Sequence, residues 1–236
     1  MADMLKDIDV FVLAGGFGKR LKKICPRVPK PMVKIGGKPF LDILLARLQE
    51  EGFGRFILGT GYKAQYIEDY YRRLKRRDVH FSRETEPLDT GGAVKKARAK
   101  IKSEDFFVLN GDSFCSFNAQ DFLDFHRVKK AAVSILLRKV DDGTDYGAIT
   151  VGKEQCITAF KEKTAGQKNI WVNAGVYIFN RKIFKMMPHK RRFSLERDIF
   201  PALAGKAIYG FKGRGGFIDI GTPERYFQAQ GLLKNG

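Results

Sequence analysis

Short apolar runs alternate with longer amphipathic segments through the first half of the chain. Four runs are rich in Val, Ile, Leu and Phe and are bounded by Gly, Asp or charged residues, as buried strands are; they cover residues 10–13, 55–59, 79–83 and 106–110. Between them lie three segments with apolar residues at helical spacing, at 40–51, 63–77 and 92–101. Strands that alternate with helices predict an α/β fold, with a Rossmann-like, mostly parallel central sheet flanked by helices.

The second half of the chain is richer in strands. They are expected at residues 133–138, 147–151, 157–161 and 172–179. Ser194 is expected to cap a helix over 195–203, and Thr222 followed by Pro223 begins another that runs to about residue 233. Since no Gly/Ser linker or repeat interrupts the sequence, we expect a single domain over residues 1–236, with a β-rich second half from about residue 131.

The loop after the first predicted strand is rich in glycine. Three glycines are followed by two cations: Gly15, Gly16, Gly18, Lys19 and Arg20. Sheets of this kind bind ligands at the carboxyl ends of their strands, and glycines let backbone N–H groups approach an anion closely. The spacing is neither GxGxxG nor that of a P-loop. A phosphate-binding loop is therefore one interpretation, and a plain tight turn is the other.

Two further features follow along the chain. Lys30 stands between Pro29 and Pro31, which hold the backbone extended and keep the cation in place. After the third predicted strand, Gly91 and Gly92 open a helix whose N-terminus is expected to face an anion or a base edge. Taken alone, Lys30 is better explained as an ordinary loop lysine, and the two glycines could equally be turn residues.

Carboxylates end two apolar runs. Asp112 follows Gly111 after the fourth predicted strand, and Asp219 stands far along the chain in a second apolar run. A carboxylate in such a place is a good ligand for a hard cation such as Mg²⁺. Spacing does not show that the two carboxylates meet, so a turn or capping role remains open for each.

Composition narrows the protein's class. The 44 Lys and Arg against 26 Asp and Glu give a formal net charge of +18, with basic clusters at 19–23, 72–77 and 190–192. This charge suits anionic small substrates, nucleic acid or an anionic membrane surface. No apolar run approaches the ~20 residues of a membrane helix, and no signal peptide is evident. Three cysteines without a CxxC pair indicate reduced thiols, so we expect a cytoplasmic protein.

Together these motifs resemble those of the sugar-1-phosphate nucleotidylyltransferase family over about residues 8 to 230. The motifs occur in the family's order: Gly15-Gly16-x-Gly18-x-Arg20-Leu21, Pro29-Lys30-Pro31-Met32, Thr90-Gly91-Gly92, Gly111-Asp112, Glu162-Lys163, Asn173-Ala174-Gly175 and Asp219-x-Gly221-x-Pro223. The first two in combination are the most specific. Within the family, residues 37–41, 86–93 and 193–198 are most similar to the guanylyltransferases of D-glycero-D-manno-heptose 1-phosphate.

The resemblance implies an enzyme that joins a nucleoside triphosphate, GTP first among them, to a sugar 1-phosphate and releases pyrophosphate. Catalytic roles would fall to Arg20, Lys30 and Asp112, with Mg²⁺ between Asp112 and Asp219. The nucleotide-binding half, to about residue 130, would use Leu13, Ala14, Gly15, Gly16, Gly18, Lys19, Arg20, Lys30, Glu86, Thr90, Gly91, Gly92, Asn110 and Gly111. The sugar-phosphate-binding half would use Gly147, Glu162, Lys163 and Asn173.

Three departures from the family pattern leave alternatives open. Lys19 replaces a usual Thr, Thr164 a usual Pro, and Asp89 a frequent Gly in the segment expected to bind the base. A relative that uses UTP, CTP or dTTP on hexose or amino-sugar phosphates fits the same motifs. The net charge suggests a non-catalytic or RNA-associated relative, but such a relative would be expected to lose charged site residues that are all present here: Arg20, Lys30, Asp112, Lys163 and Asp219. Nucleic acid and membrane are therefore not expected partners, while homo-oligomer formation stays open.

Overall fold

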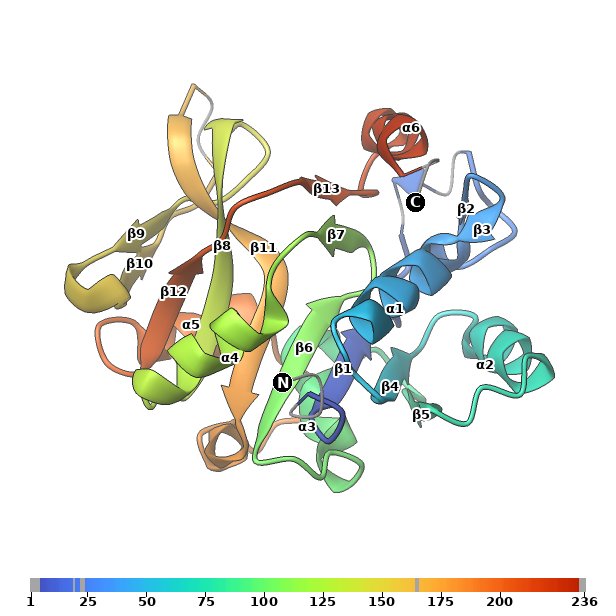
Figure 1. The fold of residues 1–236 in the computed structure, drawn as a ribbon, viewed down its shortest axis with the longest axis horizontal. Helices are drawn as coiled ribbons and strands as arrows, with labels where there is room; N and C mark the ends of the chain where they lie inside the picture. Colours follow the sequence, from blue (N-terminus) through green and yellow to red (C-terminus); the bar gives the residue numbers. More distant parts are fainter. Residues whose placement is uncertain (1–4, 19, 22–23, 164–165, 234–236) are drawn as a thin grey trace.

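The structure, a computed structural model, is built on a seven-stranded sheet (Figure 1). It describes residues 5–18, 20–21, 24–163 and 166–233. The strand order is β12-β8-β11-β6-β1-β4-β5, with bounds β1 Asp9–Leu13, β4 Arg55–Thr60, β5 Val79–Arg83, β6 Asp105–Asn110, β8 Val133–Asp142, β11 Lys168–Asn180 and β12 Ile208–Lys212. Strands β1, β4, β5 and β6 are parallel, β12 is parallel to β8, and β11 is antiparallel to both neighbours. The expected α/β fold with a mostly parallel sheet is confirmed.

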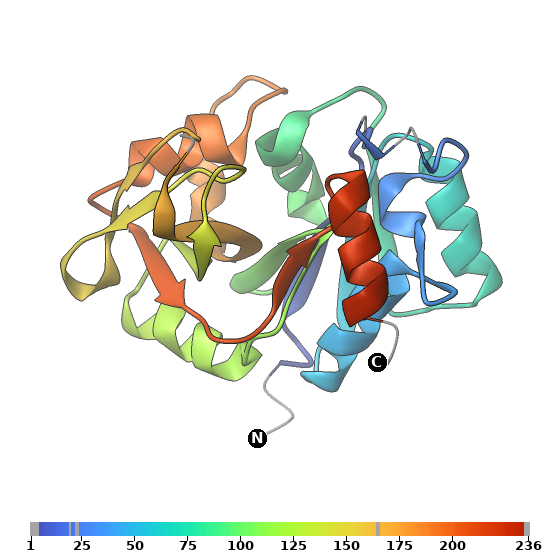
Figure 2. The same cartoon turned by 90° about the horizontal axis from the view of Figure 1, so that it is seen from above.

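Helices cover both faces of the sheet (Figure 2). One face packs against α1 (Phe40–Glu50), α2 (Ala64–Arg73) and α4 (Ala119–Val128), which contribute Leu44, Ile67 and Phe122 among others to a single apolar core. The other face packs against α3 (Asp89–Lys96), a π-helix at Leu195–Ile199 and α5 (Phe200–Leu203). With both faces buried, the central strands need continuous apolar runs, which the sequence supplies.

Smaller elements complete the molecule. Three two-stranded sheets are formed by β2 (Lys34–Ile35) with β3 (Lys38–Pro39), β7 (Ser113–Cys115) with β13 (Phe217–Asp219), and β9 (Ile149–Val151) with β10 (Ile157–Phe160). Helix α6 (Pro223–Leu232) packs on the segment around β2 in a third apolar cluster. Short 3-10 turns lie at Lys30–Met32, Ala97–Ala99, Lys153–Gln155 and Arg181–Lys185.

Several elements were not expected from the sequence. These are α4, β12 and the short pairs β2–β3 and β7–β13. The predicted helix caps are confirmed, because the Ser194 hydroxyl accepts from Arg197 N and the Thr222 hydroxyl accepts from Arg225 N. The helix after Ser194 differs in kind, since its first turn is a π-helix and α-helical geometry starts only at Phe200.

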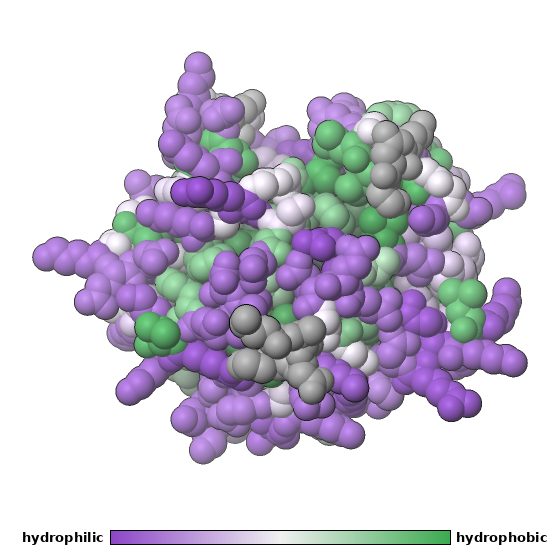
Figure 3. All heavy atoms as spheres, viewed as in Figure 1, coloured by the Kyte–Doolittle hydropathy of each residue, from purple (hydrophilic) through white to green (hydrophobic). Residues whose placement is uncertain are grey.

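Polar and charged side chains cover most of the face seen in Figure 3, and apolar ones are exposed mainly in its middle and near α6. Phe227 and Leu232 of α6 are 63% and 71% exposed. Within the described ranges, no helix has both the length and the apolar composition needed to cross a membrane.

Candidate active site

The carboxyl ends of β1, β4, β5 and β6 open into a cleft of about 570 Å³. This volume is typical of a small-molecule site. The cleft is lined by Leu13, Gly15, Gly16, Phe17, Lys30, Pro31, Gly61, Tyr62, Glu84, Thr85, Glu86, Pro87, Asp89, Thr90, Ala93, Asn110, Asp112, Arg192 and Glu196. Much of the residue set expected to bind a nucleotide thus lies around one cavity, where parallel sheets bind ligands.

The glycine loop fits closely against the neighbouring strand ends. A Cβ at Gly15 would lie 2.8 Å from Glu84 Oε1 and 3.2 Å from the Gly61 nitrogen. Gly18 has a φ of +57°, which favours glycine, and a Cβ there would lie 2.8 Å from the Lys30 Cβ. Larger residues at these positions would push the loop away from the cleft. Lys19, from the same loop, lies outside the described residues.

Lys30 is held where the two prolines were expected to place it. Its predecessor Pro29 is extended, with φ −66° and ψ 147°, and a 3-10 turn begins at Lys30. The Lys30 Nζ lies 2.5 Å from Asp112 Oδ2. The lysine side chain is 12% exposed and the carboxylate 36% exposed, so the pair lies at the cleft wall with one side open to a ligand.

Asp112 and Asp219 are brought together by the pairing of β7 with β13. In this antiparallel pair Asp219 is opposite Ser113, and Ile220 N donates to Asp112 O at 2.9 Å. The sequence could not show this juxtaposition, because each strand has only three residues. Arg20 reaches the same corner: a Cβ built at Gly221 would lie 3.6 Å from Arg20 Nη2 and 2.5 Å from Asp219 Oδ1.

Both carboxylates keep lone-pair sites that a cation could use. A carboxylate offers about four such sites. On Asp112, one oxygen accepts from Lys30 and the other from Ser113. On Asp219, three donors are bound: Tyr146, Arg225 and the amide of Gly221. The described part of the chain holds no group of three or more His, Cys, Asp or Glu suited to a metal, so the protein would offer two carboxylates. This fits Mg²⁺, which keeps waters and takes phosphate oxygens.

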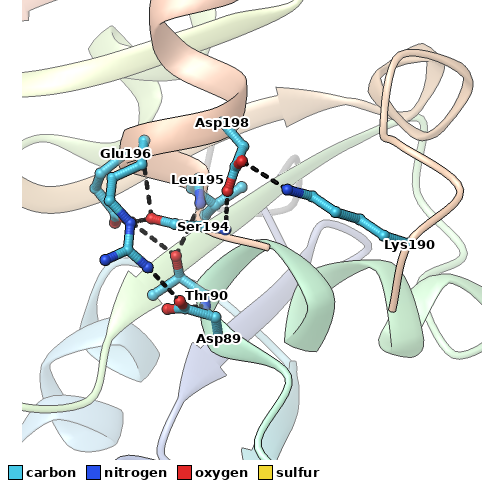
Figure 4. Close-up of polar contacts among 8 residues, drawn as sticks. Asp89, Thr90, Lys190, Ser194, Leu195, Glu196 and Asp198 are labelled. Atoms are coloured by element: carbon cyan, nitrogen blue, oxygen red, sulfur yellow. Dashed lines mark hydrogen bonds and ion pairs between the residues drawn. The ribbon is translucent and has the colours of Figure 1, made fainter. Parts of the chain in front are cut away.

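A polar cluster joins the start of α3 to the segment before α5 (Figure 4). Thr90 Oγ1 donates to Glu196 Oε2 at 2.7 Å and accepts from Leu195 N at 2.9 Å. The Ser194 hydroxyl donates to the same Glu196 oxygen at 2.8 Å. Because Thr90 and Glu196 both line the cleft, this cluster fixes the wall where two distant segments meet.

The amides of Gly91 and Gly92 do not face the cleft. Both donate to the Phe193 carbonyl oxygen, at 2.9 and 3.1 Å. A Cβ at Gly91 would lie 2.4 Å from the Phe193 ring, and one at Gly92 would lie 2.3 Å from the Arg191 oxygen. The two glycines therefore allow the segment before α5 to pack on α3, which begins earlier, at Asp89. The prediction that these amides face a base or an anion is wrong.

Three acidic residues lie from the end of β5 to the first residue of α3, and two of them are paired with arginines. Glu86 Oε1 lies 3.0 Å from Arg191 Nη1, and Asp89 Oδ2 lies 2.6 Å from Arg197 Nη2. Asp89 has a φ of +62°, a conformation in which glycine is favoured, and its other oxygen accepts from Thr90 N. This explains physically why the family often has Gly at this position.

The third acidic residue, Glu84, has no arginine partner among the described residues. Its Oε2 accepts from Leu88 N at 3.1 Å, and its Oε1 points toward Gly15 on the cleft floor. Burial raises the pKa of Glu84, chiefly because desolvation disfavours the charged form. A half-buried carboxylate with a free oxygen is therefore available to a ligand in the cleft.

The expected sugar-phosphate residues lie outside the cleft lining, in the β8–β11 half. Asn173 donates to the Tyr177 hydroxyl at 2.9 Å and accepts from Gly175 N, where the pairing of β11 with β8 is irregular. A Cβ at Gly147 would lie 2.7 Å from the Lys161 oxygen. Glu162 and Lys163 follow β10 and are exposed. The binding roles of these four residues, Gly147, Glu162, Lys163 and Asn173, stay predictions.

Several cleft residues were not singled out from the sequence: Phe17, Tyr62, Glu84, Arg192 and Glu196. The rings of Phe17 and Tyr62 lie 4.9 Å apart at the cleft wall. Glu84 had a usable signal, since it directly follows a predicted parallel strand. Arg192 belonged to a basic cluster that gave no hint of which cation faces a site.

A family model described as nucleotidyl transferase matches residues 10–236. The chain belongs to the nucleotidyl transferase family. Among its relatives, D-glycero-alpha-D-manno-heptose 1-phosphate guanylyltransferase of Aneurinibacillus thermoaerophilus is 36% identical, over 97% of this chain and 99% of the relative. The mannose-1-phosphate guanylyltransferase of Mycobacterium tuberculosis is 34% identical over 97% of this chain, which spans 65% of that relative's length.

A solved structure is similar over nearly its whole length. HddC from Yersinia pseudotuberculosis, complexed with GMP-PN, has a TM-score of 0.86 and 38% identity, and the match covers 96% of this chain and 99% of HddC. The family model, the relatives and this structure together confirm the expected enzyme class, a sugar-1-phosphate nucleotidylyltransferase.

Proposed function

We propose that this nucleotidyltransferase transfers the guanylyl group of GTP to D-glycero-D-manno-heptose 1-phosphate and releases pyrophosphate. The names of the relative from Aneurinibacillus and of the HddC ligand support this choice of substrates. The structural observation that carries the choice of base is the free oxygen of Glu84 on the cleft floor.

Guanine has two neighbouring donors on one edge, N1–H and the exocyclic amine. An ionised carboxylate is purely an acceptor, so Glu84 can accept from both. Uracil and thymine place carbonyl oxygens on either side of a single N–H, which would face the same carboxylate unfavourably. One unsatisfied buried polar group costs about 1–3 kcal/mol, and discrimination reaches roughly tenfold at about 1.4 kcal/mol. The acceptors expected from the sequence, Glu86 and Asp89, are each occupied by an arginine instead.

The reaction needs positioning and charge stabilisation. An oxygen of the sugar phosphate forms a bond to the α-phosphorus of GTP, while the bond to the bridging oxygen of pyrophosphate breaks and its electron pair leaves with pyrophosphate. The attacking phosphate has a second pKa near ~6, so it is largely a dianion at neutral pH and requires no general base. The residues that line the cleft within the described chain include no histidine, in keeping with this scheme.

Cations at the cleft would stabilise the developing charge. Arg20 and Lys30 are assigned to the triphosphate and transition state, and Arg192, which also lines the cleft, to a second phosphate group. Asp112 and Asp219 would hold Mg²⁺, which when bound neutralises phosphate oxygens. Lys163 is assigned to the sugar phosphate, with Gly147, Glu162 and Asn173 near the sugar.

Mannose 1-phosphate is the second candidate acceptor, because the Mycobacterium tuberculosis relative is named for it. Pyrophosphate release should be measured with GTP, UTP, CTP and dTTP against heptose, mannose and glucose 1-phosphates. We expect kcat/KM for GTP to exceed the others by at least about tenfold. A clear UTP or CTP preference would overturn the guanylyl assignment and leave the reaction class intact.

The role of Glu84 is tested by substitution. Glu84→Gln adds a donor that opposes the guanine amine, so the preference for GTP over UTP should fall about tenfold. Glu86→Gln tests the alternative acceptor and should keep the preference. An unchanged preference in Glu84→Gln would remove Glu84 from base recognition.

A further inference from the structure

Arg225 joins two acidic side chains from different parts of the molecule. It lies in the first turn of α6; its Nη1 donates to Asp219 Oδ2 at 2.8 Å and its Nη2 to Asp145 Oδ2 at 2.6 Å. Asp145 belongs to the connection between β8 and β9, two positions before Gly147. One guanidinium, 16% exposed, thus links the proposed metal carboxylate to the turn that leads into the proposed sugar-binding segment.

Tyr146 completes this link. Its hydroxyl donates to the same Asp219 oxygen at 3.0 Å, and the Arg225 Cζ lies 4.7 Å from its ring centroid, a cation–π geometry. Its backbone N–H donates to the Gly143 oxygen at 2.9 Å, which closes the turn.

Arg225 lies at the end of α6 where the helix dipole disfavours a positive charge. Helix N-termini carry partial positive charge and favour anions, so an arginine in the first turn opposes the helix dipole. Helix α6 is already capped by the Thr222 hydroxyl and has Glu224 in the same turn. Arg225 is therefore explained by the two carboxylates that it holds and not by any need of the helix.

We propose that Arg225 is a positioning residue that fixes Asp219 and the 143–146 turn in one geometry and thereby sets the affinity for the sugar 1-phosphate. The inference rests on the proposed function. With three of its sites occupied, Asp219 has one lone-pair direction left, on Oδ1. Without Arg225 the carboxylate could rotate and the turn would lose its tether. The cleft residues Leu13, Glu84 and Thr90 are not among the partners of this link in the described part of the chain.

Steady-state kinetics and hydrogen exchange test the proposal on the full chain. In Arg225→Gln, the KM for the sugar 1-phosphate should rise at least about tenfold, because misplacement by an ångström is costly, while the KM for GTP stays within about twofold. Amides of residues 143–148 should exchange faster, and those of the 13–18 loop should not. Asp145→Asn should raise the same sugar KM, and the double variant should be no worse than Arg225→Gln.

Arg225→Lys separates positioning from charge, since one ammonium keeps the charge but cannot span both carboxylates as the guanidinium fork does. It should leave the sugar KM raised. The matched control is Arg76→Gln, which breaks a similar half-buried pair with Asp78 at the amino end of β5 and should change neither KM.

A wild-type sugar KM in Arg225→Lys, or equal rises in the KM values for GTP and sugar phosphate in Arg225→Gln, would overturn the proposal. If the wild-type chain itself releases no pyrophosphate with any sugar 1-phosphate, the proposed function fails instead. Hydrogen exchange in the 143–148 segment still tests the link in that case, and unchanged exchange in Arg225→Gln would refute it.

Discussion

The two acidic residues that meet across β7 and β13 carry the most direct test at the scale of single residues. Asp112→Asn and Asp219→Asn keep the shape but remove a negative charge from the proposed Mg²⁺ site. Each should lower turnover by at least about 100-fold at saturating Mg²⁺ and substrates, as expected for a lost electrostatic element. Asp78→Asn, at a carboxylate bound by Arg76, is the control and should turn over normally. Near-normal rates in both cleft variants would contradict the metal assignment.

The two lysines of the proposed mechanism lie in different surroundings, so replacing each one should affect a different substrate. Lys30 is held against Asp112 beside the glycine loop, whereas Lys163 is exposed after β10, a strand of a separate two-stranded sheet. Lys30→Ala should mainly weaken the use of GTP, and Lys163→Ala should mainly raise the KM for the sugar phosphate. Initial rates with each substrate varied in turn measure this division. Equal effects on both substrates would refute it.

The placement of single residues in the cleft was predictable where the pattern is local. The prolines around Lys30 and the glycine before Asp112 predicted two cleft residues correctly. The place of Glu84 after a predicted strand was readable from the sequence, but its lack of an arginine partner among the described residues was not. Arg225 could not be predicted at all, because only its distant partners distinguish it. Arg225 is paired with Asp145, some eighty positions away, and local pattern says nothing about such a contact.

At the scale of elements, the start of α3 contains a conformation that glycine would adopt more readily. Asp89 has a φ of +62°, where a Cβ is costly. Asp89→Gly should therefore be more stable than Asp89→Ala by roughly 1–2 kcal/mol, less what glycine gains in unfolded-chain entropy, or about 1 kcal/mol net. Both variants lose the exposed pair with Arg197, so that loss cancels.

Chemical denaturation of the two Asp89 variants at neutral pH gives the comparison. Their kinetics add a second result: GTP preference should persist in both, because the Asp89 carboxylate is already paired with Arg197. If Asp89→Ala equals or exceeds Asp89→Gly in stability, strain at this position is not a factor.

The four parallel strands of the first half were predictable, and the short pairs were not. β1, β4, β5 and β6 agree with the predicted runs to within about one residue. The signal for α4 was present, since Asn118 caps it and Ala119, Phe122 and Leu123 lie at helical spacing. Strands β7 and β13 are too short for alternation to show and exist only because they pair with each other. Helix α3 was predicted over residues 92–101 but begins at Asp89. Its two glycines do not mark the helix start, because they serve close packing against Arg191 and Phe193.

At the scale of the whole molecule, the net charge of +18 calls for its own test. Polar and charged side chains are spread over the face in Figure 3. If this charge serves only solubility and anionic substrates, RNA should bind weakly, and binding should vanish near physiological salt as counterion release predicts. Filter binding of a generic RNA from low to high salt measures this. Tight binding that survives 200 mM salt would favour an RNA-associated role.

The pairing of β7 with β13 also determines when, during protein synthesis, the proposed metal site can form. A ribosome adding about 5–20 residues per second completes β7 several seconds before it reaches β13. During that interval the nascent chain can bury the core around β1, β4 and β6 while one of the two acidic groups does not yet exist. The same delay should appear in a test tube, because contacts between distant segments form late. Transferase activity should therefore return after most of the circular dichroism signal during refolding. During synthesis, the chain should likewise pass through a largely folded state that is not yet active.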